Sequence, residues 1–179
     1  MASEGLRPPK LRSPLSMNEL HITVVEADLS HPDHQAAILQ LLNAYSMDPM
    51  GDGKPLSDAA RRGLIPGLRQ HPTTIVFIAH GGAEPVGLAV CFRGFSTFAA
   101  RPLMNVHDFF VSPAYRGAGV GRLIFAEIER RARQLGCCKL TLEVLENNHR
   151  ARSIYAAAGF SQPVYGPGLG ASLFLSKSL

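Results

Sequence analysis

The chain has 179 residues, of which 46% are hydrophobic and 18% charged, and its formal net charge at pH 7 is +4. These values are typical of one ordinary globular domain and argue against a disordered or fibrous protein. The mild positive charge is spread along the chain apart from Arg130, Arg131 and Arg133, so it does not indicate a nucleic-acid-binding surface, although an anionic ligand is compatible with it.

The N-terminal part combines an aperiodic segment with a first strand and helix. Residues 1–18 contain prolines, serines and basic residues without periodicity, so the sequence predicts a disordered leader followed by a single domain over residues 19–179. The β-branched run at residues 21–26 predicts a strand. A helical pattern follows, with Ser30 or Asp33 as its expected start.

A loop rich in Asp, Gly and Pro comes next, at residues 47–55. Ser57 or Asp58 is expected to cap a second helix that reaches His71 and bends at Pro66. We regard this region as a candidate substrate lid.

Three strands are predicted in the middle of the chain. Residues 73–79 and 86–97 are β-rich runs joined by a turn, which predicts an antiparallel hairpin. A third strand runs over residues 103–112 and ends at Pro113, because proline has no N–H to donate to a strand ladder.

The C-terminal part returns to alternating helices and strands. Apolar residues at helical spacing from Val120 to Leu135 predict an amphipathic helix that ends at Gly136. Residues 139–145 alternate as a strand, and residues 171–176 predict a closing strand. Between these strands, a short helix is predicted, capped by Asn148 and ending before Gly159; the order of elements indicates an α/β fold.

Three glycines, Gly117, Gly119 and Gly121, stand at alternate positions where the third middle strand leads into the long helix. Backbone N–H groups at such a turn converge on an anion, and the helix N-terminus adds about half a positive charge. The segment therefore predicts a pyrophosphate cradle, with Arg116 and Arg122 as further cations. A tight turn that needs glycine only for its geometry is the alternative.

Two other phosphate-binding motifs do not fit this turn. A P-loop requires Lys followed by Ser or Thr after the last glycine, where Arg122 and Leu123 stand. A dinucleotide fingerprint requires glycine at the position of Arg122. ATP, GTP, NAD and FAD are therefore disfavoured.

The spacing Arg116-x-x-Gly119-x-Gly121 resembles the acetyl-coenzyme A motif of the GNAT superfamily of acetyltransferases. The family's C-terminal pattern is matched by Asn148, Ala151, Tyr155, Gly159 and Phe160. The resemblance extends from about residue 22 to the C-terminus. It implies a mixed, mostly antiparallel central sheet, splayed in the middle and flanked by helices, with acetyl-coenzyme A as cosubstrate.

The resemblance also implies which residues bind the coenzyme. Its pantothenate arm pairs with strand backbone, and its pyrophosphate lies in the glycine turn. The expected coenzyme-binding residues are Phe109, Phe110, Val111, Arg116, Gly117, Ala118, Gly119, Val120, Gly121, Arg122, Asn148, Arg152 and Tyr155. The family transfers the acetyl group by direct attack in a ternary complex, with a backbone N–H near Phe110 holding the oxyanion, and requires no metal.

Tyr155 is the candidate acid, because a phenol with a pKa near ~10 can protonate a departing thiolate whose pKa is ~8.5. A core aromatic is the alternative. His107 or Asp108, or a water chain, is the candidate base. The strand around them is similar to that of spermidine/spermine acetyltransferases, where Glu stands in place of His107. Strand alternation puts His107 and Asp108 on opposite faces.

The sequence thus predicts transfer of an acetyl group to a primary amine of a small molecule. Segment 93–98 resembles the acceptor-side loop of polyamine and thialysine acetyltransferases. A protein N-terminal or lysine acetyltransferase and a non-catalytic acyl-coenzyme A sensor are the alternatives. Three cysteines without a disulfide or zinc pattern favour the cytoplasm, no apolar run approaches the ~20 residues of a membrane span, and a homodimer is expected from the family.

Overall fold

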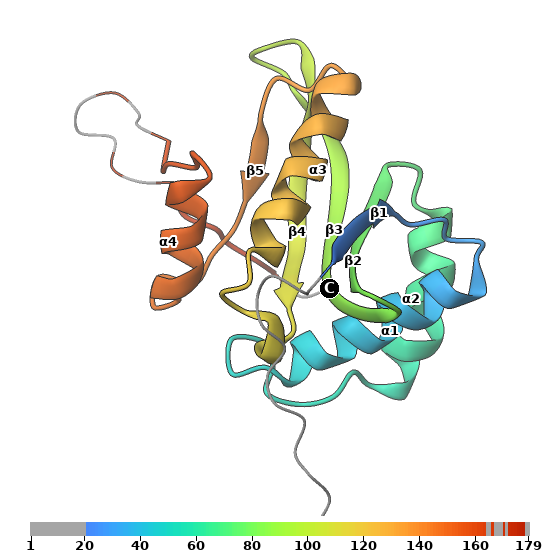
Figure 1. The fold of residues 1–179 in the computed structure, drawn as a ribbon. Coiled ribbons are helices and arrows are strands. Elements are labelled where there is room, and N and C mark those ends of the chain that lie inside the picture. The colour runs from blue at the N-terminus through green and yellow to red at the C-terminus, as the bar shows by residue number, and fades with distance from the viewer. Residues whose placement is uncertain (1–20, 164–165, 167–169, 171, 178–179) are drawn as a thin grey trace, which may run out of the picture.

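The computed structural model describes residues 21–163, 166, 170 and 172–177, so the predicted leader at 1–18 lies outside the described residues. Its strands are β1 (Ile22–Glu26), β2 (Thr74–Gly81), β3 (Glu84–Ser96), β4 (Arg101–Val111) and β5 (Leu140–Leu142). Its α-helices are α1 (Pro32–Met47), α2 (Asp58–Gln70), α3 (Val120–Gln134) and α4 (His149–Ala157), and a 3-10 turn, η1 (Pro113–Tyr115), precedes α3. Figure 1 shows helices on both faces of an open sheet, which confirms the predicted α/β class.

The sheet has the order β1-β2-β3-β4-β5 and is antiparallel except for the parallel pair β4 and β5. β5 pairs with β4 only at Met104, Asn105 and Val106. β4 continues to Val111 without this neighbour. The mixed sheet with a split between β4 and β5 confirms the prediction.

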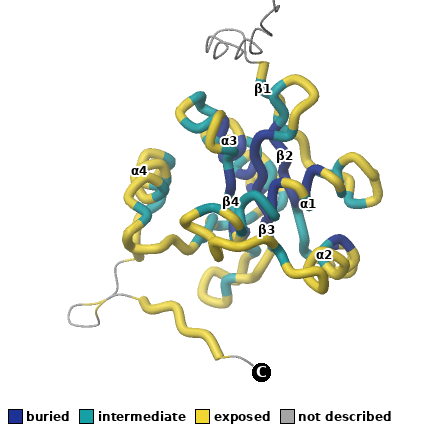
Figure 2. The backbone as a smooth tube through the Cα atoms, turned by 90° about the horizontal axis from the view of Figure 1, so that it is seen from below, coloured by how far each residue is buried: buried dark blue, intermediate teal, exposed yellow. Residues whose placement is uncertain are grey.

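Each face of the sheet buries its own hydrophobic cluster. On one face, Ile124 and Ile128 of α3 pack against Phe77, Met104 and Val106 of the strands. The opposite face packs against α1 and α2 through a second set, which includes Ile38, Leu41, Ile78, Leu88 and Phe110. Figure 2 shows the dark blue buried backbone concentrated in the central strands, whereas α4 lies at the edge of the molecule.

The helix boundaries follow local capping chemistry. α1 starts one residue after His31, whose Nδ1 accepts from the Asp33 N–H at 3.3 Å, so neither Ser30 nor Asp33 is its cap. Ser57 caps α2 as predicted, with its hydroxyl accepting from the Ala60 N–H at 3.1 Å. No helix in the described ranges carries an apolar stretch long enough to cross a membrane.

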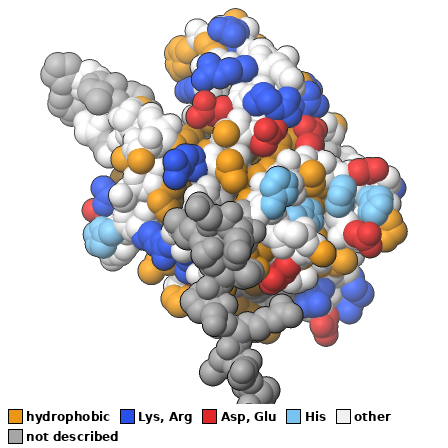
Figure 3. Space-filling model, in the orientation of Figure 1, with side chains coloured by type: hydrophobic (Ala, Val, Ile, Leu, Met, Phe, Trp, Pro, Cys, Tyr) orange, Lys and Arg blue, Asp and Glu red, His pale blue; other side chains and the backbone are white. Residues whose placement is uncertain are grey.

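The three clustered arginines of α3 are engaged in ion pairs with glutamates. The pairs are Arg130–Glu127, Arg131–Glu26 and Arg133–Glu129. On the face shown in Figure 3, basic and acidic side chains are interspersed. The arginine cluster seen in the sequence is therefore a charge-balanced helix surface.

The predicted closing strand at 171–176 is wrong as far as the structure describes it. Ala171 lies outside the described residues, and residues 172–177 form no strand; Leu173, Phe174 and Leu175 are exposed. β5 is also shorter than the predicted 139–145. Apolar alternation gives only a propensity, and a strand forms where the backbone finds a neighbouring strand to pair with.

Candidate active site

β4 contains a β-bulge at the position of the two candidate bases. Val90 of β3 pairs with Asp108, and the next residue, Cys91, pairs with Val106. His107 is therefore an extra residue in β4. A bulge of this kind interrupts the alternation of side chains between the two faces of a sheet.

The bulge brings His107 and Asp108 to the same face. Phe110 is buried on the α1/α2 side, and Asp108, two residues earlier, shares that face. The His107 ring lies 5.4 Å from the ring of Phe92, which packs on the same side. The prediction that the two residues point to opposite faces is wrong, because it assumed regular alternation through the strand.

Asp108 lies in an environment that favours its protonated form. Burial raises the pKa of this carboxyl above its ordinary value, and the nearby His107 offsets part of that effect. Tyr45 of α1 lies close to this site: burial raises its pKa, and Asp108 raises it further. The ring of Tyr45 is 5.8 Å from that of Phe110. Sequence reasoning missed Tyr45, although it follows the buried Leu41 by one helical turn.

The glycine turn has the backbone geometry of an anion cradle. Gly119 is the N-cap of α3 with φ of 81°, in the left-handed region that favours glycine. A Cβ there would lie 3.6 Å from Nη2 of Arg122. The first N–H groups of α3 have no partner within the helix, as at any helix start. Gly121 differs, since a Cβ there would meet Cζ of Phe109 at 3.4 Å, so glycine allows α3 to approach β4.

The two arginines predicted to neutralise phosphate are in different situations. Arg116 forms an ion pair with Asp48 at the end of α1, and its Nε donates to the Val111 carbonyl at 2.8 Å. Its guanidinium also lies 5.7 Å from the ring centroid of Phe110. Arg122 is exposed and makes no ion pair within the described residues. Arg122 is therefore the available cation, whereas Arg116 ties the loop after α1 to the glycine turn.

Asp48 is the nearly buried partner in this ion pair, with 8% of its side chain exposed. Burial alone would raise its pKa, but hydrogen bonds from the Met50 N–H and from Arg116 together outweigh burial and lower it. A lowered pKa in the folded state contributes stability that is present above the ordinary pKa of Asp and is lost as the pH falls through the folded-state value.

Replacing Asp48 with Asn is therefore expected to lower the free energy of unfolding by about 1–3 kcal/mol at pH 7, because Arg116 loses a charged partner. The deficit should shrink as the pH falls below about 4, because the carboxyl of the unfolded wild-type chain then takes up a proton, whereas the folded-state carboxyl, whose pKa is lowered, stays charged to a lower pH. Urea unfolding of both proteins at pH 7 and pH 3.5 measures the difference. A deficit that stays constant between these pH values would contradict a role for the carboxylate charge.

Tyr155 of α4 lies in an aromatic cluster on the α3 side of the sheet. Its ring centroid is 6.1 Å from Phe109, 5.7 Å from Phe125 and 6.1 Å from Phe160. Burial raises the pKa of Tyr155 to about 12, so its phenol stays protonated across the physiological range. The candidate acid thus lies on the opposite side of β4 from His107 and Asp108.

The remaining predicted contacts of α4 have visible structural partners. The side-chain oxygen of Asn148 accepts from the Ala151 N–H at 3.1 Å and so caps α4, as predicted. Arg152 donates from Nη1 to the Glu146 carbonyl at 2.9 Å, which fixes the loop before the helix. These contacts give both residues a local structural role.

The end of β4 separates the two groups of candidate catalytic residues. From His107 to Val111, its backbone has no strand neighbour on the β5 side within the described residues. Phe109 and Val111 pack toward α3, whereas Phe110 packs toward α1 and α2. The predicted coenzyme-contacting strand therefore lies beside the glycine turn with one edge of its backbone unpaired.

Cys91 is near Asp108 but is unsuited to be a nucleophile. It is fully buried, and burial raises the pKa of its thiol to about 12. A thiol of this kind has a negligible thiolate fraction at neutral pH. Cys91 is therefore not a candidate nucleophile for this site.

Comparison with known proteins agrees with this geometry. Residues 37–160 match the acetyltransferase (GNAT) family. The chain is 36% identical over 74 residues to the thialysine N-epsilon-acetyltransferase of Bos taurus, covering 41% of this chain and 43% of that protein. It is 28% identical over 95 residues to an uncharacterised N-acetyltransferase of Bacillus subtilis, covering 53% and 63%.

These alignments span about half the length of the curated relatives. Among solved structures, a probable acetyltransferase is similar in fold with a TM-score of 0.71 at 16% identity, covering 87% of this chain and 99% of that one.

Proposed function

Because this chain belongs to the acetyltransferase (GNAT) family, we propose that it transfers an acetyl group from acetyl-coenzyme A to a primary amine of a small molecule. The observation that carries the proposal is the left-handed Gly119 at the start of α3, beside the unpaired end of β4. The turn at Gly119 suits the pyrophosphate of the coenzyme, and the unpaired edge of β4 suits its amide-containing arm.

The residues present fit the coenzyme on physical grounds. The turn leaves room for phosphate where a side chain at Gly119 would stand, and Arg122 lies within reach of that space. The free backbone of β4 near Phe110 and Val111 would pair with the amide-containing arm. Arg116 would act mainly by holding the turn in place through Asp48 and the Val111 carbonyl.

When bound, acetyl-coenzyme A supplies an activated acetyl group as a thioester. On this proposal, the acceptor approaches from the α1/α2 face, where Asp108 or His107 takes the proton that the amine loses, directly or through water. The raised pKa of Asp108 makes it a stronger base than an ordinary carboxylate. On the other side of β4, Tyr155 holds a proton on its phenol oxygen for the sulfur. The amine nitrogen gains the acetyl group and the sulfur gains a proton.

Two further features support the setting of this reaction. The relative that acetylates thialysine is named for an amine substrate, which favours an amine acceptor here. Cys91, Cys137 and Cys138 are free thiols, which agrees with a reducing cytoplasm. A homodimer remains the expectation from the family.

Acetyl-coenzyme A is expected to raise the melting temperature by roughly 5–10 °C at about 100 times its dissociation constant, because a ligand bound only by the folded state stabilises it. ATP and NADH at the same concentration should give no comparable shift. Thermal unfolding of the full chain tests this. Equal protection by all three, or by none, would count against the glycine turn as a coenzyme site.

Release of free thiol in the presence of candidate amines then distinguishes the alternatives. An enzyme releases coenzyme A only with an acceptor, whereas an acyl-coenzyme A sensor binds without turnover. Acetylation of peptides but of no free amine would indicate a protein acetyltransferase.

A further inference from the structure

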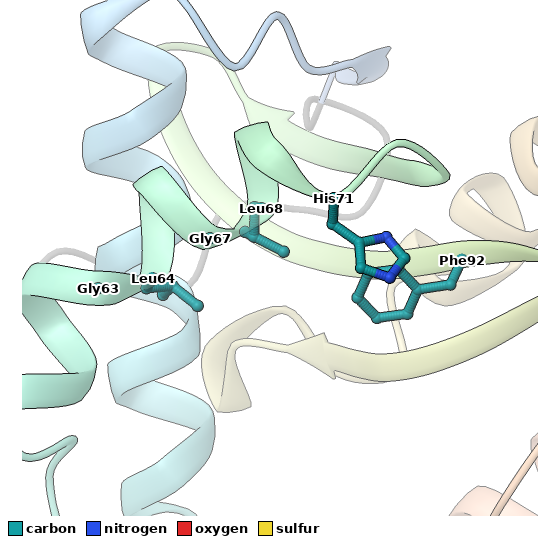
Figure 4. A pocket seen from close by; sticks show the side chains of 6 residues that line it. All are labelled: Gly63, Leu64, Gly67, Leu68, His71 and Phe92. Carbon is teal, nitrogen blue, oxygen red and sulfur yellow. The ribbon is translucent and has the colours of Figure 1, made fainter.

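An open pocket lies between α2 and β3, on the same face of the sheet as His107 and Asp108. Its volume is about 280 Å³. Figure 4 shows its lining, which consists of Gly63, Leu64, Gly67, Leu68, His71 and Phe92. These residues offer two leucines, one phenyl ring and one imidazole, and none of them is a carboxylate. The pocket can therefore cover an apolar group but cannot pair a second positive charge.

A row of three rings leads from the pocket to the candidate base His107. Phe92 lies 4.8 Å from His71 on one side and 5.4 Å from His107 on the other, measured between ring centroids. Phe92 pairs with Asn105, and Val90, two residues away on β3, pairs with Asp108. Since a strand rises ~3.4 Å per residue, the pocket and Asp108 are about 7 Å apart along the strand.

We propose that this pocket binds the apolar body of the acceptor, so that the preferred substrate is a primary monoamine carrying an aromatic or branched apolar group on a short spacer. This inference rests on the proposed acetyl transfer and specifies its acceptor. Such an amine can place its nitrogen near Asp108 and its apolar group beside Phe92 at the same time.

A polyamine fits the same site poorly. Its second ammonium group would reach a pocket whose lining holds no carboxylate, so it would gain no ion pair there and would keep apolar surface of the pocket uncovered. A hydrophobic pocket discriminates between substrates by about 10- to 200-fold per well-placed group.

The direct test compares 3-phenylpropylamine with n-propylamine and spermidine as acceptors, at saturating acetyl-coenzyme A and with the full chain. We expect kcat/KM for 3-phenylpropylamine to exceed that for either competitor by at least about tenfold, mainly through KM. An equal or higher kcat/KM for spermidine would overturn the proposal.

Gly67→Leu fills the pocket without threatening the fold. A Cβ at Gly67 would meet no heavy atom within 4 Å, and replacing a helix-interior glycine favours the helix. The preference for 3-phenylpropylamine over n-propylamine should fall to about one in this variant. The matched control is Arg69→Leu, which adds the same side chain to α2 outside the pocket and should keep the preference. A preference that survives Gly67→Leu would place the acceptor elsewhere.

Failure of this inference and failure of the proposed function give different results. Acetylation of all amines without preference, together with binding of acetyl-coenzyme A, would reject the pocket and keep the enzyme. If coenzyme binds but no amine is acetylated, ligand-observed NMR of 3-phenylpropylamine shows whether the pocket binds this amine, independently of turnover. Binding that is lost in Gly67→Leu supports the pocket, and no binding to the wild type rejects it.

Discussion

Replacing Gly119 with Glu is expected to weaken acetyl-coenzyme A binding by at least about 100-fold, which corresponds to roughly 3 kcal/mol. Gly119 has a φ of 81° and caps α3, so the new side chain would project at the turn where phosphate is expected. Its carboxylate would occupy that space, repel the pyrophosphate and pair with the nearby Arg122, whose Nη2 lies 3.6 Å from the Cβ position. Isothermal titration calorimetry with acetyl-coenzyme A measures the loss.

The required control separates loss of the site from backbone strain. Gly136 lies just beyond the other end of α3 with φ of 70°, and a Cβ there would meet no atom within 4 Å. Gly136→Glu therefore imposes a similar left-handed penalty and the same charge, far from the turn. It should lose a similar amount of stability and keep its coenzyme affinity. Unchanged affinity in a folded Gly119→Glu protein would locate the pyrophosphate elsewhere.

Replacing Tyr155 with Phe is expected to reduce kcat by roughly 10²- to 10⁴-fold with little change in coenzyme affinity. The ring would remain packed against Phe109, Phe125 and Phe160, so only the phenol oxygen and its proton are removed. Because the pKa of Tyr155 is raised to about 12, its ionisation should not limit the wild-type rate at any pH below about 11. Single-turnover kinetics isolates the chemical step.

A second tyrosine provides a matched control for this substitution. The phenol of Tyr115, in the turn η1, donates to Glu84 at 2.8 Å. Tyr115→Phe removes one hydrogen bond but no candidate proton donor, and should change kcat by less than about twofold. Undiminished chemistry in Tyr155→Phe would reduce Tyr155 to a core aromatic that anchors α4.

Local sequence signals predicted most of the fold. Capping by Ser57 and Asn148 depends on residues three positions away, and α3 ends next to Gly136, whose φ of 70° favours glycine. Such signals act within a few residues and can be recognised in a sequence. The glycine turn was found in the same way, because its spacing is fixed by the backbone.

The missed features depend on contacts between distant parts of the chain. Arg116 and Asp48 are 68 residues apart, so their ion pair could not be inferred from spacing. The pocket at His71 and Phe92 exists only after α2 has packed beside β3. The predicted strand at 171–176 failed for a related reason, since its pattern is sound but the described residues have no strand partner.

The bulge at His107 changes which residues of β4 face α3. Before it, the residues packed under α3 are even-numbered, Met104 and Val106; after it they are odd-numbered, Phe109 and Val111. The extra residue thus changes the parity of the strand midway. Removing His107 would restore strict alternation and keep both core pairs facing α3, with Asp108 still on the opposite face. The hydrophobic core therefore does not require the inserted residue, and what the insertion adds is a second ionisable side chain beside Asp108 on one face.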